Sequence, residues 1–337
     1  MKEAMFYEKL DGKRINCNLC YHRCSSIAVS RKGICGVREN IDGELYSLVY
    51  GRVVACAVDP IEKKPLFNFL PGSKSYSIAT VGCNFRCDNC QNYDISQLPK
   101  DQNIIVGQEV LPEQIISLAK RSNCVSIAYT YSEPTIFFEY AYDVARIAKK
   151  EGLKNIFVTN GYITPEALHE IAPYLDAVNI DLKSFSDDFY RKRCGARLQS
   201  VLDSIKLYKS LGIWTEITTL IIPSLNDSEE ELRKIAEFIK DLGEDIPWHI
   251  TQFHPTYKLI DLPRTPVNTL RRAREIGLEA GLRYVYEGNV PGESGENTYC
   301  HNCKKNLIHR FGYQIQNNKI KNSVCTYCGV KIDGIYS

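Results

Sequence analysis

Short apolar runs alternate with longer segments of helical periodicity between about residues 75 and 290. The runs have the length of buried strands and span residues 75–81, 125–130, 155–159, 177–181, 214–222 and 248–253. Apolar residues then recur with the helical period over residues 112–120, 135–150, 165–172, 198–211, 228–242 and 269–280. These six strand–helix units predict an α/β fold with a parallel sheet, open or curled into a partial (β/α)6 barrel.

Two shorter regions flank the predicted barrel. In the first, the alternating segments 44–50 and 52–58 predict a half-exposed β-hairpin. Residues 59–72 contain three prolines, and they predict an ordered connector that wraps onto the barrel. We therefore divide the chain into an N-terminal four-cysteine module with its connector, the barrel and a C-terminal tail, at residues 1–74, 75–298 and 299–337.

Charge and hydropathy limit the classes of function. The 337 residues carry a formal net charge of +2, which argues against attachment to nucleic acid or membrane by bulk basic charge. No apolar run approaches the roughly 18 residues of a membrane-spanning helix. The first residues lack the apolar core of a signal peptide. The sequence therefore predicts a cytoplasmic protein that does not bind membranes.

Cysteine is the most informative residue type. The chain holds 14 cysteines, and 11 of them fall into three groups. Because cytosolic thiols stay reduced, such groups indicate metal binding rather than disulfides. The groups are Cys17, Cys20, Cys24 and Cys35; then Cys83, Cys87 and Cys90; then Cys300, Cys303, Cys325 and Cys328. The middle group has one thiol too few for a closed four-ligand site, which indicates an open metal position.

The middle group directly follows the first predicted barrel strand. Three and then two residues separate Cys83, Cys87 and Cys90. A loop of this spacing can wrap three thiolates around an iron–sulfur cluster and leave one iron open to a small molecule. The alternative is a zinc ion completed by a distant residue, but no obvious fourth ligand lies nearby in the sequence.

This loop resembles the signature of the radical S-adenosylmethionine (SAM) superfamily, which places it after the first strand of a partial β/α barrel. The resemblance implies a 4Fe–4S cluster whose open iron binds the amino and carboxylate groups of SAM. It also implies reductive cleavage of SAM to a 5′-deoxyadenosyl radical, which abstracts hydrogen from a substrate. Many members carry an aromatic residue just before the last cysteine, where this chain has Asn89.

Later strand ends resemble the pyruvate formate-lyase activating enzyme branch of the superfamily. Residues 131–134 (Tyr-Ser-Glu-Pro) are similar to the Gly-Gly-Glu-Pro segment of that branch, which implies that Glu133 pairs with the SAM ammonium. Alternatively, Glu133 is an acid at a helix N-terminus. His249 is predicted to be structural. The residues expected to bind SAM are Ser132, Glu133, Asn160, Asp181, Lys183 and, beside the adenosine, His254.

Residues 45–53, 59–66 and 78–83 narrow the resemblance to the AmmeMemoRadiSam set of radical SAM proteins. This likeness implies Memo-like partner proteins and an electron donor such as flavodoxin or ferredoxin. The substrate is then a protein, as for an activating enzyme, or a small molecule or peptide. The alternative function is RNA modification, with RNA recruited by a basic tail. The tail has one acidic residue, Asp333, against Lys304, Lys305, Arg310, Lys319, Lys321 and Lys331.

The two outer cysteine groups predict closed metal sites. Two Cys-x2-Cys pairs have the spacing of a zinc ribbon and predict structural zinc on Cys300, Cys303, Cys325 and Cys328. The N-terminal group predicts either zinc or a second iron–sulfur cluster that delivers electrons or binds substrate; its residues are Cys17, Cys20, Cys24 and Cys35.

Three cysteines stand alone. Cys56 and Cys124 lie in apolar runs and are predicted to be inert core residues. Cys194 follows the basic stretch 190–193, and neighbouring cations lower the pKa of a thiol. It is a candidate for substrate handling or hydrogen-atom donation, and the alternative is an incidental loop thiol.

Overall fold

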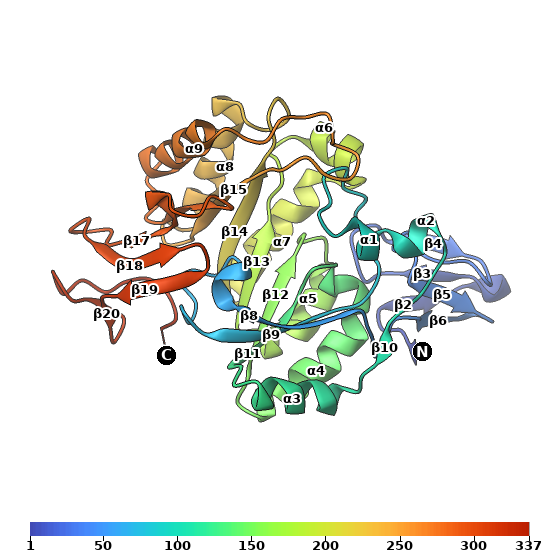
Figure 1. Ribbon diagram of the computed structural model, residues 1–337. Coiled ribbons are helices and arrows are strands. Elements are labelled where there is room, and N and C mark those ends of the chain that lie inside the picture. Colours follow the sequence, from blue (N-terminus) through green and yellow to red (C-terminus); the bar gives the residue numbers. More distant parts are fainter. Residues whose placement is uncertain (337) are drawn as a thin grey trace.

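A central sheet of eight strands organises the protein, of which the computed structural model describes residues 1–336 (Figure 1). Seven neighbouring strands are parallel, and β8 lies antiparallel to β9 at one edge. In spatial order the strands are β16 (Val285–Gly288), β15 (Trp248–Gln252), β14 (Trp214–Ile221), β13 (Ala177–Asp181), β12 (Lys154–Thr159), β11 (Ser126–Tyr129), β9 (Lys74–Ala79) and β8 (Ala55–Pro60). The predicted α/β class with a mainly parallel sheet is confirmed.

Six longer helices connect the strands and pack on the sheet (Figure 1). They correspond to the six predicted helical segments and are α3 (Pro112–Arg121), α4 (Phe138–Lys150), α5 (Pro165–Ile171), α7 (Leu198–Ser210), α8 (Glu229–Leu242) and α9 (Val267–Glu279). Helices α3 and α5 begin with proline, whose missing N–H costs nothing at a first turn. The Ser228 hydroxyl caps α8 by accepting the Glu231 N–H.

The short helical segments lie mostly in loops. The short α-helices are α1 (Tyr93–Ser96), α2 (Leu98–Asp101) and α6 (Asp187–Phe189). The 3-10 turns are η1 (Asp11–Lys13), η2 (Ile61–Lys63), η3 (Pro134–Phe137), η4 (Ala172–Tyr174) and η6 (Ser294–Glu296), and η5 (Tyr190–Cys194) is a π-helical turn.

Two strand predictions are wrong. The segments predicted as a hairpin do not pair with each other: β6 (Glu44–Ser47) pairs with β5 (Arg38–Ile41) and β1 (Lys2–Glu3), whereas β8 joins the central sheet. Alternation identifies a buried face but not the partner strand. A seventh parallel strand, β16, was not among the six predicted strands, because four residues carry little periodic signal.

The N-terminal module consists of small antiparallel sheets packed on the barrel. Its remaining strands are β2 (Tyr7–Lys9), β3 (Ile15–Cys17), β4 (Cys24–Ile27) and β7 (Arg52–Val53), the last paired with β10 (Gln108–Glu109). Buried Ile15, Val37 and Leu45 belong to one apolar cluster with barrel residues. The module and the barrel therefore share a core.

The connector after β8 fills the inner side of the sheet. Ile61, Leu66 and Phe69 are buried against Ala128 of β11 and Ile156 of β12. The connector is fixed by Glu216 on β14, which is fully buried. Its carboxylate accepts the N–H groups of the connector residues 67 and 68, the Trp214 indole N–H and a hydrogen bond from His249. His249 thus has the structural role expected for it.

The C-terminal tail packs against the same connector. Its strands are β17 (Thr298–Tyr299), β18 (Asn306–Phe311), β19 (Gln314–Asn318), β20 (Ile320–Lys321) and β21 (Val324–Cys325). Arg310, one of the basic residues of the tail, is buried and donates to the Phe67 carbonyl. The Leu70 N–H donates to the Ile335 carbonyl. Within residues 1–336, no helix has the length and apolar character needed to cross a bilayer.

Candidate active site

A cavity of about 460 Å³ opens where the parallel strands end. Residues that directly follow β11, β12 and β16 line it, in keeping with the rule that ligands bind at the carboxyl ends of parallel strands. The cavity brings together most of the predicted site: Cys83, Cys87, Cys90, Ser132, Glu133, Asn160, Asp181 and Lys183. His254 lies two residues beyond β15, half-buried, and is not among the lining residues.

Backbone contacts hold the three-cysteine loop after β9. Gly82 has φ +104°, and a Cβ there would lie 2.6 Å from Val37 Cγ1, so both conformation and space require glycine. The N–H groups of Arg86 and Asp88 donate to the carbonyls of Cys194 and Arg193. Burial raises the pKa of Cys83 and Cys90. Metal binding would reverse this effect, because a coordinated thiol is deprotonated.

Glu133 joins the ends of β11 and β12. One carboxylate oxygen accepts the Thr135 N–H and hydroxyl and the Thr159 hydroxyl. The other accepts the Asn160 N–H at 2.8 Å. Burial raises the pKa of Glu133. The carboxylate caps η3, as the alternative interpretation required, and it also lines the cavity.

Asp181 and Lys183 provide paired opposite charges at the end of β13. Lys183 Nζ lies 2.8 Å from Asp181 Oδ2. Burial lowers the pKa of Lys183, but the Asp181 carboxylate and the nearby thiols outweigh this effect and hold that pKa well above its ordinary value. Such a pair suits a zwitterionic ligand, since the ammonium can face a carboxylate and the carboxylate an ammonium.

Two polar atoms beside the cavity have no protein partner. The hydroxyl of Ser132 and the side-chain oxygen of Asn89 are buried and without a hydrogen bond in the described chain. Both residues line the cavity. Buried polar atoms normally find a partner, so these two fit a polar ligand. Asn89, the departure from the aromatic pattern, thus offers a hydrogen bond instead of a ring face.

Sequence reasoning missed a charged group on the connector side of the cavity. Lys64 is buried, and its ammonium lies 2.6 Å from Asp59 Oδ2. Tyr131 and Ser77 also donate to this carboxylate. Burial lowers the pKa of Lys64 to about 8. The sequence does contain a signal for this charged group, because charged residues stand within an otherwise apolar, proline-containing connector.

The lone cysteines match their predictions only in part. Cys194 is fully buried in η5, does not line the cavity and contacts Cys87, where it raises the pKa of the Cys87 thiol. The basic residues before it therefore do not make it an exposed reactive thiol. Cys124 is buried as expected, but Cys56, on the edge strand β8, is exposed.

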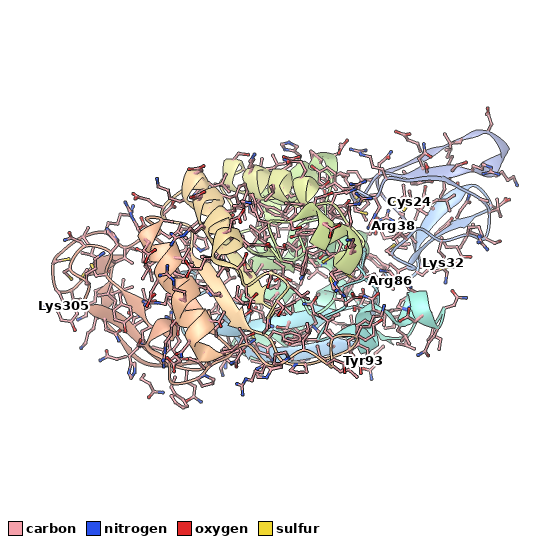
Figure 2. The ribbon with its side chains drawn as sticks, turned by 90° about the horizontal axis from the view of Figure 1, so that it is seen from above. Cys24, Lys32, Arg38, Arg86, Tyr93 and Lys305 are labelled. Atoms are coloured by element: carbon pink, nitrogen blue, oxygen red, sulfur yellow. The ribbon has the colours of Figure 1, made fainter. Side chains whose placement is uncertain are left out.

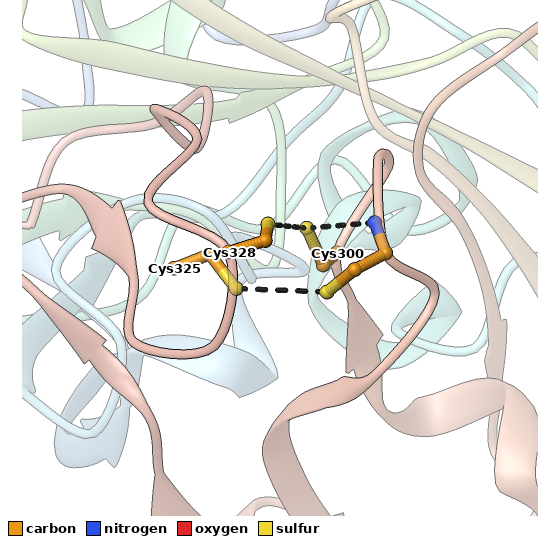
Figure 3. Close-up of side chains that lie close together, drawn as sticks. Cys300, Cys325 and Cys328 are labelled. Carbon is orange, nitrogen blue, oxygen red and sulfur yellow. Dashed lines mark hydrogen bonds between the residues drawn. The ribbon is translucent and has the colours of Figure 1, made fainter.

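The C-terminal cysteines form a compact four-thiol group. Their sulfurs all lie within 4.8 Å of one another, with Cys300–Cys328 and Cys303–Cys325 distances of 3.7 and 3.8 Å (Figure 3). A tetrahedral ion with metal–sulfur bonds of about 2.3 Å places its ligands about 3.8 Å apart. Hydrogen bonds to its sulfur hold the pKa of Cys328 below its ordinary value, and the bond from the Val330 N–H has the largest effect. The group fits one tetrahedral ion.

The N-terminal cysteines gather around a two-stranded ladder. Cys17 on β3 lies directly opposite Cys24 on β4. Burial and then the charge of Cys17 raise the pKa of Cys20 well above its ordinary value. Burial also raises the pKa of Cys35 to about 11, against the opposing effect of Arg38. The four residues therefore form a single group.

The fold and the cavity define a class: an α/β protein with a three-thiol loop and a polar ligand site at the carboxyl ends of a parallel sheet. A model of the radical SAM superfamily matches residues 77–239. The chain is 49% identical over 336 residues to the uncharacterized protein MJ0808 of Methanocaldococcus jannaschii, with 99% of each chain covered.

More distant similarities agree. The pyruvate formate-lyase-activating enzyme of Clostridium pasteurianum is 25% identical over 218 residues, covering 61% of this chain and 89% of that enzyme. Streptococcus suis SuiB, solved with S-adenosylmethionine, has the same fold, with a TM-score of 0.51, 14% identity and coverage of 68% of this chain and 53% of SuiB. The chain belongs to the radical SAM superfamily. Membership implies a 4Fe–4S cluster and SAM.

Proposed function

We propose that the protein is a radical SAM oxidoreductase that abstracts a hydrogen atom from a substrate bound in the cavity. The observation that carries the proposal is the convergence of Cys83, Cys87 and Cys90 with the Asp181–Lys183 pair around one cavity. When bound at the three thiols, the cluster supplies an electron for SAM cleavage and thereby the radical chemistry.

The chain's own residues bind, orient and shield. Lys183 is suited to the SAM carboxylate, and Asp181 and Glu133 to its ammonium. The unpartnered oxygens of Ser132 and Asn89 add polar contacts. The enclosing strand ends restrict water around a reactive species.

The distant relatives support a protein substrate, because several are named as pyruvate formate-lyase activating enzymes. A small molecule or peptide is the second substrate class, and the similarity to the AmmeMemoRadiSam set, with its Memo-like partners, stays a prediction. RNA modification is not favoured: one of the six basic tail residues, Arg310, is buried.

The test is anaerobic turnover of the iron-loaded protein with SAM and a low-potential reductant. We expect 5′-deoxyadenosine and methionine, and label in 5′-deoxyadenosine when a deuterated substrate is correct. Fully loaded protein that produced neither product would contradict the proposal.

Lys183→Ala is expected to weaken SAM binding while iron content stays normal. The change removes a charge-assisted hydrogen bond worth about 1.5–3 kcal/mol, which corresponds to about 10- to 150-fold in affinity. Isothermal titration under nitrogen measures the effect. Lys192→Ala is the matched control, because Lys192 pairs with Asp188 on the surface. Equal affinities in both variants would refute the role of Lys183.

We also propose that the C-terminal group holds structural zinc. Replacing Cys303 and Cys328 together by serine should remove about one zinc per chain and expose residues 299–337 to protease, because metal links the two cysteine pairs. Elemental analysis and limited proteolysis measure these effects, and Cys56→Ser is the control. Iron with sulfide but no zinc at this group would refute the assignment.

A further inference from the structure

The three cysteine groups differ in how far apart their sulfurs lie. Among residues 1–336, only the C-terminal group brings its ligand atoms all within 4.8 Å. No three sulfurs of the N-terminal group do so, and neither do Cys83, Cys87 and Cys90. A cluster of several irons holds its thiolates farther apart than one ion does. The N-terminal group therefore shares with the three-cysteine loop an arrangement that is not that of a single-ion site.

A buried guanidinium next to the N-terminal group supports a charged metal–thiolate centre there. Arg38 is 1% exposed and pairs with Glu139 at 3.0 Å. Two of its nitrogens are nevertheless buried without a hydrogen-bond partner. Arg38 lies near Cys24, and Figure 2 shows both in the N-terminal module. Hydrogen-bond donors near cluster sulfurs stabilise the reduced state and tune its potential.

The N-terminal group also packs directly on the three-cysteine loop of the active site. A Cβ on Gly82, the residue before Cys83, would lie 3.5 Å from the Cys35 carbonyl. His22, between Cys20 and Cys24, donates from Nε2 to the Asn84 carbonyl at 2.8 Å. The N-terminal group and the three-cysteine loop are thus packed against each other, with protein atoms rather than solvent between them.

A basic hollow opens on the surface between these two groups. It has a volume of about 780 Å³, and its lining includes residues 33–34, beside Cys35, and Asn84. Its charged lining residues are one acid, Glu39, and the cations Arg31, Lys32, Arg86 and Lys100. Figure 2 shows Lys32 and Arg86 at the same end of the molecule as Cys24. A surface of this sign attracts an acidic partner.

We propose that Cys17, Cys20, Cys24 and Cys35 hold a second iron–sulfur cluster, which receives electrons from an acidic one-electron carrier protein docked on the basic hollow. The carrier, of the flavodoxin or ferredoxin class, loses one electron and the N-terminal cluster gains it. The electron then passes to the cluster on Cys83, Cys87 and Cys90. No bond forms or breaks and no proton moves. This inference rests on the proposed function.

Metal content tests the cluster without any assay of activity. We expect about eight irons, eight sulfides and one zinc per anaerobically loaded chain. Cys20→Ser with Cys24→Ser should halve the iron and sulfide and leave the zinc unchanged. About four irons with two zincs in the unaltered protein would overturn the proposal. If the proposed function failed instead, the N-terminal iron would remain while SAM was not cleaved.

Reduction kinetics test the docking surface. Arg31→Glu with Lys32→Glu should slow cluster reduction by reduced flavodoxin at least about tenfold at low salt, because steering contributes 10-fold or more to association. Reduction by dithionite should be slowed far less. The matched control is Lys319→Glu with Lys321→Glu, on the tail marked by Lys305 in Figure 2. Equal flavodoxin rates in the two charge-reversed proteins would overturn the docking site.

Discussion

Replacing Cys83, Cys87 and Cys90 together by alanine is expected to abolish SAM cleavage. These three thiols follow β9 within one short loop and face the cavity that holds the proposed SAM residues. Thiolates are the ligands of iron–sulfur clusters, so the variant has nothing to bind the catalytic cluster. Product formation should fall to the level without protein, measured as 5′-deoxyadenosine by chromatography under nitrogen.

The same variant should lose the electron paramagnetic resonance signal that changes when SAM is added. Cys56→Ala is the matched control, because Cys56 is exposed on the edge strand β8, outside the cavity lining. Undiminished cleavage in the triple variant would show that the catalytic cluster lies elsewhere.

Glu216→Ala is expected to lower the free energy of unfolding by about 3–5 kcal/mol, the range for breaking a buried charged contact. Its carboxylate accepts two connector N–H groups, the Trp214 indole N–H and a hydrogen bond from His249. Each buried donor left without an acceptor costs about 1–3 kcal/mol. The connector would be the first segment to loosen.

Urea unfolding of the Glu216 variant measures the loss, provided the slope with denaturant is unchanged. Glu237→Ala on the exposed side of α8 is the control, with an expected change within about 0.5 kcal/mol. A Glu216 variant as stable as this control would mean that other contacts hold the connector.

The sequence was sufficient for the sheet class because buried parallel strands and amphipathic helices have distinct periods. The sequence did not predict β16, because Val285–Gly288 is too short to show a pattern. It also did not predict the partner of β8, which pairs with β9 at the edge of the central sheet. Partner choice depends on long-range packing, which alternation does not encode.

The same distinction between local pattern and long-range packing applies to the residues of the candidate site. The cysteines and the ends of β11–β13 were predictable because they are local segments with fixed spacing. Lys64 and Asp59 were not, because their approach to Tyr131 depends on how the connector enters the barrel. The burial of Cys194 likewise depends on the loop that it meets, Arg86 and Cys87, far away in the sequence.

The contact between connector and tail determines when the protein can finish folding during synthesis. Leu70 leaves the ribosome early, but its N–H donates to the carbonyl of Ile335, which is synthesised much later. The same holds for the Phe67 carbonyl, which waits for Arg310. Contacts between such distant positions close late. The inner side of the barrel is therefore completed only after residues 310 and 335 have been made, so the cavity reaches its final shape late in synthesis.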